Sequence, residues 1–316
     1  MKKIFGLILL CFIFLVGCNS KDNTDGVTKV TNYLSSLDSY SLSSTMKIKR
    51  TDKEISLDVD VDYLAPNYYK VEFNGESQQL ILKNDSGVFV ISKQLNKEFK
   101  FDNNWPMNGS HPYLLETINK DIKADSEASC YLDGENFVVE CKIEHKTNQS
   151  LNKLKYTCTK DFVPVSTKFI NSEGKTIITV EFTSFLQDSN LSKDNFNQKN
   201  YLNKQEEGNE EESSLDVTTG FIIDGSSLTS SVEKEDTVIL CYSGDTNYTI
   251  IVNKVYVTDE VVAIDDYDDI EYLESGLGLL SENSMRFYIN NYEITIYSNS
   301  LTVSDYITIA ESITLA

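Results

Sequence analysis

The chain has 316 residues, enough for two domains of ordinary size, and 40% hydrophobic and 11% aromatic residues, the composition of a folded protein. Its formal net charge of −21 is unevenly distributed: residues 1–204 carry 25 Lys+Arg against 26 Asp+Glu, a net of −1, whereas residues 205–316 carry 3 against 23, a net of −20. Because so acidic a surface repels a phosphate backbone, no nucleic-acid partner is expected.

The N-terminus has the pattern of an export signal. Met1-Lys2-Lys3 is basic, and Ile4 to Val16 is a run of 13 uncharged residues, whereas a membrane-spanning helix needs about 20. The end of this run, Leu15-Val16-Gly17-Cys18, resembles the bacterial lipobox. The resemblance implies a lipoprotein signal peptide (1–17) cleaved before Cys18, a thioether-linked diacylglycerol with acyl chains such as palmitate on the Cys18 sulfur, and a tether (18–24). It also implies a lipid-anchored protein on the extracytoplasmic face of the cell membrane. The alternative is an uncleaved hydrophobic anchor with a chance cysteine.

Most of the next 160 residues alternate as strands do. After a helical pattern (Val27, Val30, Leu34), apolar and polar residues alternate with a period of two, most clearly from Glu54 to Tyr63. We count about eleven strands between Tyr40 and Phe185, interrupted once by a partly helical insert at residues 103–122. Since only two helical segments can cover the apolar side of so long a sheet, the sequence predicts a mainly β fold with some α: a half-open antiparallel β-barrel with a helical plug.

This arrangement resembles a known family. The stretches Gln79 to Asn84, Gly87 to Ser92 and Asn104-Trp105-Pro106 look like the LolA/LolB/RseB family, and more narrowly like LolA-like sporulation and germination lipoproteins of Firmicutes. The resemblance covers residues 25–200. In the carriers of the family the apolar face is a cavity for acyl chains; the alternative is that the helices fill it as an ordinary core. The candidate ligand-binding face consists of Met46, Ile48, Leu57, Val59, Val61, Tyr69, Val71, Phe73, Leu80, Leu82, Phe99, Phe101, Trp105 and Leu115.

The C-terminal third is predicted to be a separate unit. Residues 201–217 are polar and acidic and read as a linker. Residues 218–316 show short strands and a closing helix capped by Thr302 or Ser304, and Tyr292 to Ser298 with Ile309 to Ile313 resembles a small extracytoplasmic domain of unknown function. That match implies a small α+β domain without activity. In its acidic segment, Asp265 to Glu274, the run Asp265-Asp266-Tyr267-Asp268-Asp269 is interpreted as a solvated loop. A calcium site is the alternative, although the EF-hand spacing and its glycine are missing.

Side chains that could carry chemistry are few. The only histidines, His111 and His145, have no Gly-x-Ser-x-Gly elbow nearby, and neither a phosphate-binding glycine loop nor a CxxC pair occurs, so no catalytic residue, cofactor or metal is expected. If the hairpin from Phe137 to Thr159 turns at Gln149-Ser150, Cys141 and Cys158 lie opposite each other and could form a disulfide. Two buried free thiols are the alternative.

The expected function follows from the anchor and the resemblance. We expect a non-enzymatic lipoprotein that binds a partner protein of the envelope or spore cortex, or an apolar ligand, in sporulation, germination or envelope sensing. An acyl-chain or lipoprotein carrier is the alternative, and a hydrolase a remote one.

Overall fold

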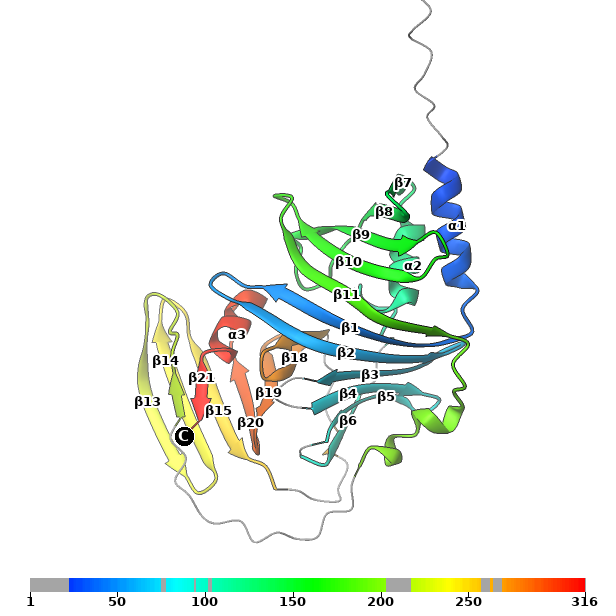
Figure 1. The fold of residues 1–316 in the computed structure, drawn as a ribbon. Coiled ribbons are helices and arrows are strands. Elements are labelled where there is room, and N and C mark those ends of the chain that lie inside the picture. The colour runs from blue at the N-terminus through cyan, green and yellow to red at the C-terminus, as the bar shows by residue number, and fades with distance from the viewer. Residues whose placement is uncertain are drawn as a thin grey trace, which may run out of the picture.

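The computed structural model describes residues 23–74, 78–93, 95–101, 104–202, 217–256, 262–263 and 269–315. The predicted signal peptide, Cys18, the tether up to residue 22 and residues 203–216 of the predicted linker lie outside the described residues. Two units lie side by side, and the N-terminal one is dominated by a strongly curved sheet (Figure 1).

Eleven strands and two helices build the N-terminal unit. The helices are α1 (Asn23–Ser35) and α2 (Leu115–Ala124). The strands are β1 (Ser39–Lys49), β2 (Glu54–Leu64), β3 (Tyr68–Asn74), β4 (Gln78–Asn84), β5 (Gly87–Ser92), β6 (Lys97–Phe101), β7 (Ser129–Asp133), β8 (Asn136–Lys142), β9 (Leu151–Thr159), β10 (Pro164–Asn171) and β11 (Thr176–Gln187). Two short 3₁₀ helices, η1 (Lys193–Phe196) and η2 (Gln198–Asn200), end the unit.

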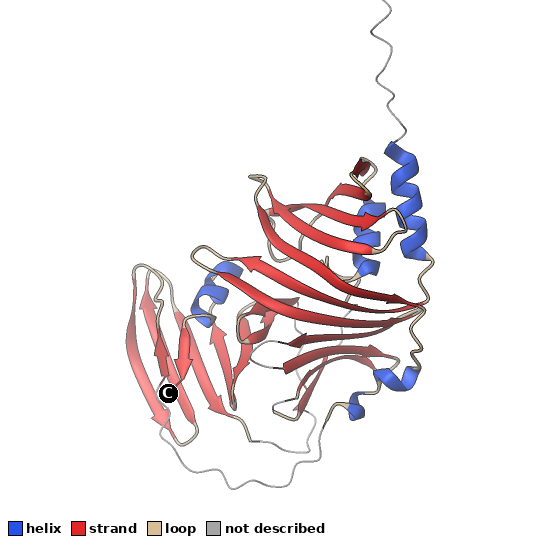
Figure 2. Ribbon diagram, viewed as in Figure 1, coloured by secondary structure: helices blue, strands red, loops and turns tan. Residues whose placement is uncertain are grey.

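The sheet is antiparallel from β1 to β11 and does not close. Its order is β6-β5-β4-β3-β2-β1-β11-β10-β9-β8-β7, and a two-residue strand, β16 (Val262–Ala263), is added parallel to β6. Both helices lie on the concave side of the curve (Figure 2). The expectation of a mainly β, half-open antiparallel barrel of eleven strands with a helical plug is thereby confirmed.

The alternation in the sequence explains how the central strands fold. In β2 every second residue from Ile55 to Tyr63 is buried, and its neighbours are exposed or half-buried. The pairing of β1 with β2 sets Met46 opposite Leu57, so the buried residues of both strands share the concave face.

The C-terminal unit is a second, smaller sheet with one helix. Its order is β13-β14-β15-β20-β19-β18-β17, and β12 pairs with β21 beside it. Thr302 caps the helix with a reciprocal hydrogen-bonded pair to Asp305, as expected from the sequence. The elements are β12 (Val217–Thr219), β13 (Ser226–Lys234), β14 (Thr237–Gly244), β15 (Tyr248–Lys254), β17 (Asp269–Leu273), β18 (Gly276–Ser281), β19 (Ser284–Ile289), β20 (Tyr292–Tyr297), α3 (Val303–Ala310) and β21 (Ile313–Leu315).

The two units share part of one hydrophobic core. In the acidic segment Asp265 to Glu274, residues 269–273 form strand β17, and Ile270 and Tyr272 are buried in the core of the curved sheet. The reason is that the acidic side chains alternate with apolar ones, so one side of the strand can face a dry surface. Residues 265–268, which include most of the possible calcium ligands, lie outside the described residues.

The pairing of β8 with β9 contradicts the predicted disulfide between Cys141 and Cys158. Cys141 lies opposite Leu154 and Cys158 lies opposite Phe137, and both cysteines are buried free thiols. Four residues of strand separate the two positions, about 13 Å, which is beyond disulfide reach. The turn comes two residues earlier than assumed because the His145 Nδ1 atom accepts a hydrogen bond from the Asn148 amide and the Asn148 side chain accepts one from the Ser150 amide.

Candidate functional site

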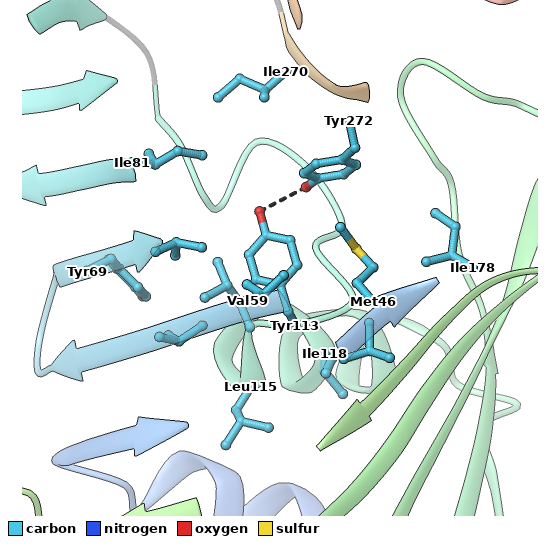
Figure 3. Close-up of a cluster of buried hydrophobic side chains, with 14 of the residues drawn as sticks. Met46, Val59, Tyr69, Ile81, Tyr113, Leu115, Ile118, Ile178, Ile270 and Tyr272 are labelled. Atoms are coloured by element: carbon cyan, nitrogen blue, oxygen red, sulfur yellow. Dashed lines mark hydrogen bonds between the residues drawn. The ribbon is translucent and has the colours of Figure 1, made fainter. Parts of the chain in front are cut away.

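The concave face of the curved sheet, the predicted ligand site, is almost entirely buried. The thirteen predicted members whose side chains the structure describes are at most 3% exposed, and Figure 3 shows Met46, Val59 and Tyr69 of the sheet beside Leu115 of the helical insert. The structure places eleven of the fourteen predicted residues in one core cluster: Met46, Ile48, Leu57, Val59, Val61, Tyr69, Val71, Phe73, Phe99, Trp105 and Leu115.

The helical insert fills the middle of this face. Leu115, Ile118 and Ile122 recur along α2 at helical spacing and are at most 1% exposed. Trp105 and Tyr113, from the loop before α2, are also buried, and the Trp105 ring meets Tyr69 edge-on with ring centroids 5.8 Å apart.

The C-terminal unit fills the rest of the face, which the sequence did not indicate. The Tyr272 ring lies 5.7 Å from that of Phe73, and its hydroxyl shares a 2.8 Å hydrogen bond with Tyr113 (Figure 3). Tyr288 stacks on Phe99 with ring centroids 5.1 Å apart. Six residues of this unit belong to the core cluster of the curved sheet: Val255, Ile270, Tyr272, Leu277, Leu279 and Tyr288.

Leu80 and Leu82, which were predicted for the concave face, lie on the convex side of the sheet instead. In β4, Ile81 lies opposite Val71 and shares its concave face, so Leu80 and Leu82 point to the convex side. There they form a second cluster with Tyr68, Phe89, Ile91 and Phe196, the last of which comes from η1. Three consecutive apolar residues in β4 made its alternation ambiguous, and only the pairing with β3 resolves it. Phe101 lies in β6 opposite Val88, and its side chain is outside the described residues.

Next to the buried face lies an open cleft of about 1750 Å³, which we call the polar cleft because most of the residues that line it are polar or charged. The curved sheet contributes three turns to it: the turn after β1, the β8–β9 loop and the β10–β11 turn. The C-terminal unit contributes β17, α3 and the segment after β12. Figure 1 shows α3 next to the tip of the β1–β2 hairpin. Of the described residues predicted for the ligand site, Ile48 alone lines the cleft.

A cluster of charged side chains joins the two units at the cleft. The Arg50 guanidinium donates to the Tyr272 carbonyl at 2.5 Å and lies 3.4 Å from the Glu311 carboxylate. Lys53 contacts Glu311 at 3.4 Å and Glu274 at 2.5 Å. Because the Glu311 side chain is only 7% exposed, its charge requires these partners.

Both histidines of the chain lie at this cleft, which their positions in the sequence did not reveal. His111 is buried: its Nδ1 atom lies 3.3 Å from the Tyr272 hydroxyl, and its Nε2 atom has no hydrogen-bond partner in the described part of the chain. Burial lowers the pKa of His111 to about 3 and that of His145 to about 4, so both rings are neutral near pH 7.

Two carboxyl groups show the opposite shift. Burial raises the pKa of Glu271, at the cleft, to about 7, and that of Glu116, on α2, to about 7. The Glu116 carboxylate accepts a 2.8 Å hydrogen bond from the Tyr40 hydroxyl, and its other oxygen is buried. Among the described residues no group of three or more metal-ligating side chains occurs, and no described helix is long and apolar enough to cross a membrane.

Comparison with known proteins agrees with the family suggested by the sequence. The family described as "Sporulation protein YdcC-like" matches residues 1–196. Sporulation protein YdcC of Bacillus subtilis (strain 168) is 26% identical over 329 residues, an alignment that covers 98% of this chain and 97% of that protein.

Solved structures of similar fold include the MucA/MucB complex of Pseudomonas aeruginosa, with a TM-score of 0.37, 11% identity and coverage of 93% of this chain and 98% of that chain. The LolA superfamily protein NE2245 of Nitrosomonas europaea has a TM-score of 0.33 and 12% identity, and the match covers 56% of this chain and 98% of that chain.

Proposed function

The chain belongs to the YdcC-like sporulation protein family, and from this premise we propose that it is a non-enzymatic lipoprotein that binds a partner protein at its polar cleft. In this proposal Cys18 carries the lipid anchor on the extracytoplasmic face of the cell membrane, and the partner belongs to the envelope or spore cortex. The observation that carries the proposal is the contrast between a concave face that is filled and a cleft that is open.

The filled face argues against an acyl-chain carrier. A carrier must offer apolar walls around a space large enough for the chain. Here α2, the loop before it and strands β17 to β19 occupy the concave side, and their apolar side chains pack directly on those of the sheet. An acyl chain could enter only if these elements moved, which would expose their own apolar surface.

The cleft suits a polypeptide segment because its walls offer both polar and apolar side chains. The β8–β9 loop contributes Asn148 and Gln149, helix α3 contributes Ser304 and Thr308, and the walls carry charges of both signs. Loops held by a rigid sheet are common sites of recognition. A polar segment of a protein could form hydrogen bonds with such walls while water remains at the rim.

The anchor sets the orientation of the molecule at the membrane. Only residues 19–22 lie between Cys18 and α1, which begins at Asn23, so Cys18 starts a span of five residues. Five residues span at most roughly 17 Å when extended. The start of α1 therefore lies close to the bilayer, and the C-terminal unit, at the other end of the molecule in Figure 1, faces away from it.

The cleft is tested by blocking it. Gln149 is exposed at its rim, and Asn190 is equally exposed in the loop after β11, away from the cleft. Anchored protein carrying Gln149→Trp should recover about tenfold less of a co-purifying protein than wild type, whereas Asn190→Trp should recover as much. Equal recovery by both variants would refute the cleft as the binding site.

The anchor needs a separate measurement. Cys18→Ala should move the protein from the membrane fraction to the soluble fraction, and mass spectrometry of the wild-type N-terminus should show a diacylglyceryl group on the Cys18 sulfur. A wild-type protein that still carries residues 1–17, or an unmodified Cys18, would contradict the anchor.

A further inference from the structure

The edges of the two sheets are not equally protected. At one edge of the large sheet β7 has only five residues and packs against α1, and at the other β16 has two residues. In the small sheet β17 is buried against the curved sheet through Ile270 and Tyr272. Strand β13 is different: it has nine residues, it ends the small sheet, and no described strand pairs with its outer side.

The side chains of β13 leave this edge open. Eight of its nine residues are exposed, and Leu228 and Val232 are 47% and 50% exposed. Between Ser226 and Val232 the strand contains neither proline nor charge, the usual means by which an edge is kept from pairing. Its register slips between Leu228 and Ser230, so one bulge interrupts this stretch, and the charged Glu233 and Lys234 stand only at the end of the strand.

An apolar row on the sheet continues up to this edge. Val232 lies opposite Ile239, and Ile239 lies opposite Ile251, all on the sheet face away from α3. Ile239 and Ile251 are only half-buried. A further strand beside β13 could extend this row with an apolar side chain of its own, next to Val232.

Acidic groups flank both ends of β13. Asp224 precedes the strand, and Asp245 lies beside its start, where its amide donates to the Gly225 carbonyl. Glu233, Glu235 and Asp236 are exposed at its other end, where Lys234 is the single basic residue of the strand. This lies within a C-terminal third of net charge −20. A segment that pairs with β13 should therefore carry positive charge at its ends.

We propose that β13 binds an extended, basic segment of a partner protein, which is added to the small sheet as a further antiparallel or parallel strand. Backbone hydrogen bonds to the open edge would give affinity, alternate apolar side chains would contact Val232, and lysine or arginine residues at the ends would contact the acidic groups. None of the residues lining the cleft belongs to β13, so this second docking surface goes beyond the function proposed for the cleft.

Two synthetic peptides test the edge. Both have the nine-residue length of β13 and alternate Thr and Val, but one has Lys at each end and the other has Glu. The lysine peptide should bind the full-length lipoprotein in detergent about tenfold more tightly than the glutamate peptide in fluorescence polarisation. It should also slow hydrogen exchange of the backbone amides of residues 226–234.

Substitutions on the edge provide the control. Val232→Lys adds a repelling charge and should weaken the lysine peptide about tenfold, whereas Val163→Lys, at a position 41% exposed on the other unit, should not. Thr229→Pro, at the bulge, removes one backbone donor of the edge strand and should also weaken binding. Circular dichroism should show that all three variants fold.

Three results would overturn the proposal: equal binding of the two peptides, unchanged exchange in residues 226–234, or full binding by Val232→Lys. A dimer in sedimentation that Val232→Lys dissociates would overturn it too, because a second copy would then occupy the edge. Gln149→Trp should leave peptide binding unchanged, so failure at the edge and failure at the cleft are distinguishable.

Discussion

The concave face of the curved sheet and the polar cleft beside it are neighbours with opposite properties. The face is lined by apolar side chains and is closed by α2, by the loop before it and by Tyr272 and Tyr288 of the C-terminal unit. The cleft is lined by turns, remains open and contains charged and hydroxyl side chains. A curved sheet of this kind therefore does not imply a ligand cavity, because the elements that fill it can come from a distant part of the chain.

The largest loss of stability should come from removing the buried Tyr272 side chain from the closed face. Tyr272→Ala removes a buried ring that contacts Phe73 and Tyr113, and we expect the free energy of unfolding to fall by about 3–5 kcal/mol. Urea unfolding measures this loss. Tyr297→Ala, at a position 43% exposed on the small sheet, is the matched control and should change stability by less than about 0.5 kcal/mol. Similar losses for both variants would mean that the two units do not share a core.

A buried carboxyl group on α2 should make the closed face sensitive to pH. Burial raises the pKa of Glu116 to about 7 from the usual 4.5 of a glutamate, so the folded state holds the proton more tightly than the unfolded state. Its contribution to stability is then largest below about pH 4.5 and is lost as the pH rises through about 7.

Glu116→Gln removes this dependence and retains an acceptor for the Tyr40 hydroxyl. In urea unfolding, the free energy of unfolding of the variant relative to that of wild type should rise by on the order of 2 kcal/mol from pH 5 to pH 8. Glu271 in the folded state and the histidines in the unfolded state also titrate across this range, but they are present in both proteins and cancel in the difference. A difference in stability that stays constant with pH would contradict a protonated Glu116.

The charged cluster at the cleft should matter less than the closed face. Arg50→Ala leaves the Tyr272 carbonyl without this donor and removes one partner of the nearly buried Glu311. We expect the free energy of unfolding to fall by about 1–2 kcal/mol. Lys47→Ala, which removes an exposed pair with Glu181 at 3.8 Å, should cost less than about 0.5 kcal/mol. If Arg50→Ala were equally mild, the cluster would not help to hold the units together.

The smallest effect concerns the cysteines. Cys141 and Cys158 are buried free thiols that do not lie opposite each other. Reducing agent should therefore leave the thermal midpoint unchanged. Alkylation after unfolding without reductant should label both cysteines. If the thermal midpoint fell on reduction, a Cys141–Cys158 disulfide would be indicated, and the pairing of β8 with β9 would have to differ from the one described here by four residues.

The sequence predicted the fold well wherever one face of a strand is dry and the other wet. The strict alternation in β2 and the capping pair at Thr302 required no knowledge of distant contacts. Prediction failed where such a signal was ambiguous: β4 has three apolar residues in a row, and the β8–β9 turn is set by the side chains of His145 and Asn148.

The site was harder to predict than the fold because it is made by contacts between units. Nothing local distinguishes Tyr272 from other tyrosines among acidic residues, yet it is central to the closed face. In the same way His111 and His145 are 34 residues apart in the sequence and meet only because the insert and the β8–β9 loop line one cleft. Alternating apolar residues in Asp269 to Leu273 were the one signal that could have indicated a buried strand.

The most direct measurement is the binding of a fluorescent fatty acid to the chain with Cys18→Ala, which removes the protein's own acyl chains. With the concave face filled by α2 and by Tyr272, titration should show no saturable binding, and native mass spectrometry should show no co-purifying lipid. Tyr272→Ala, which opens the face, should bind the probe if it remains folded. One fatty acid bound per molecule of the otherwise unaltered protein would contradict a closed face and would favour an acyl-chain carrier.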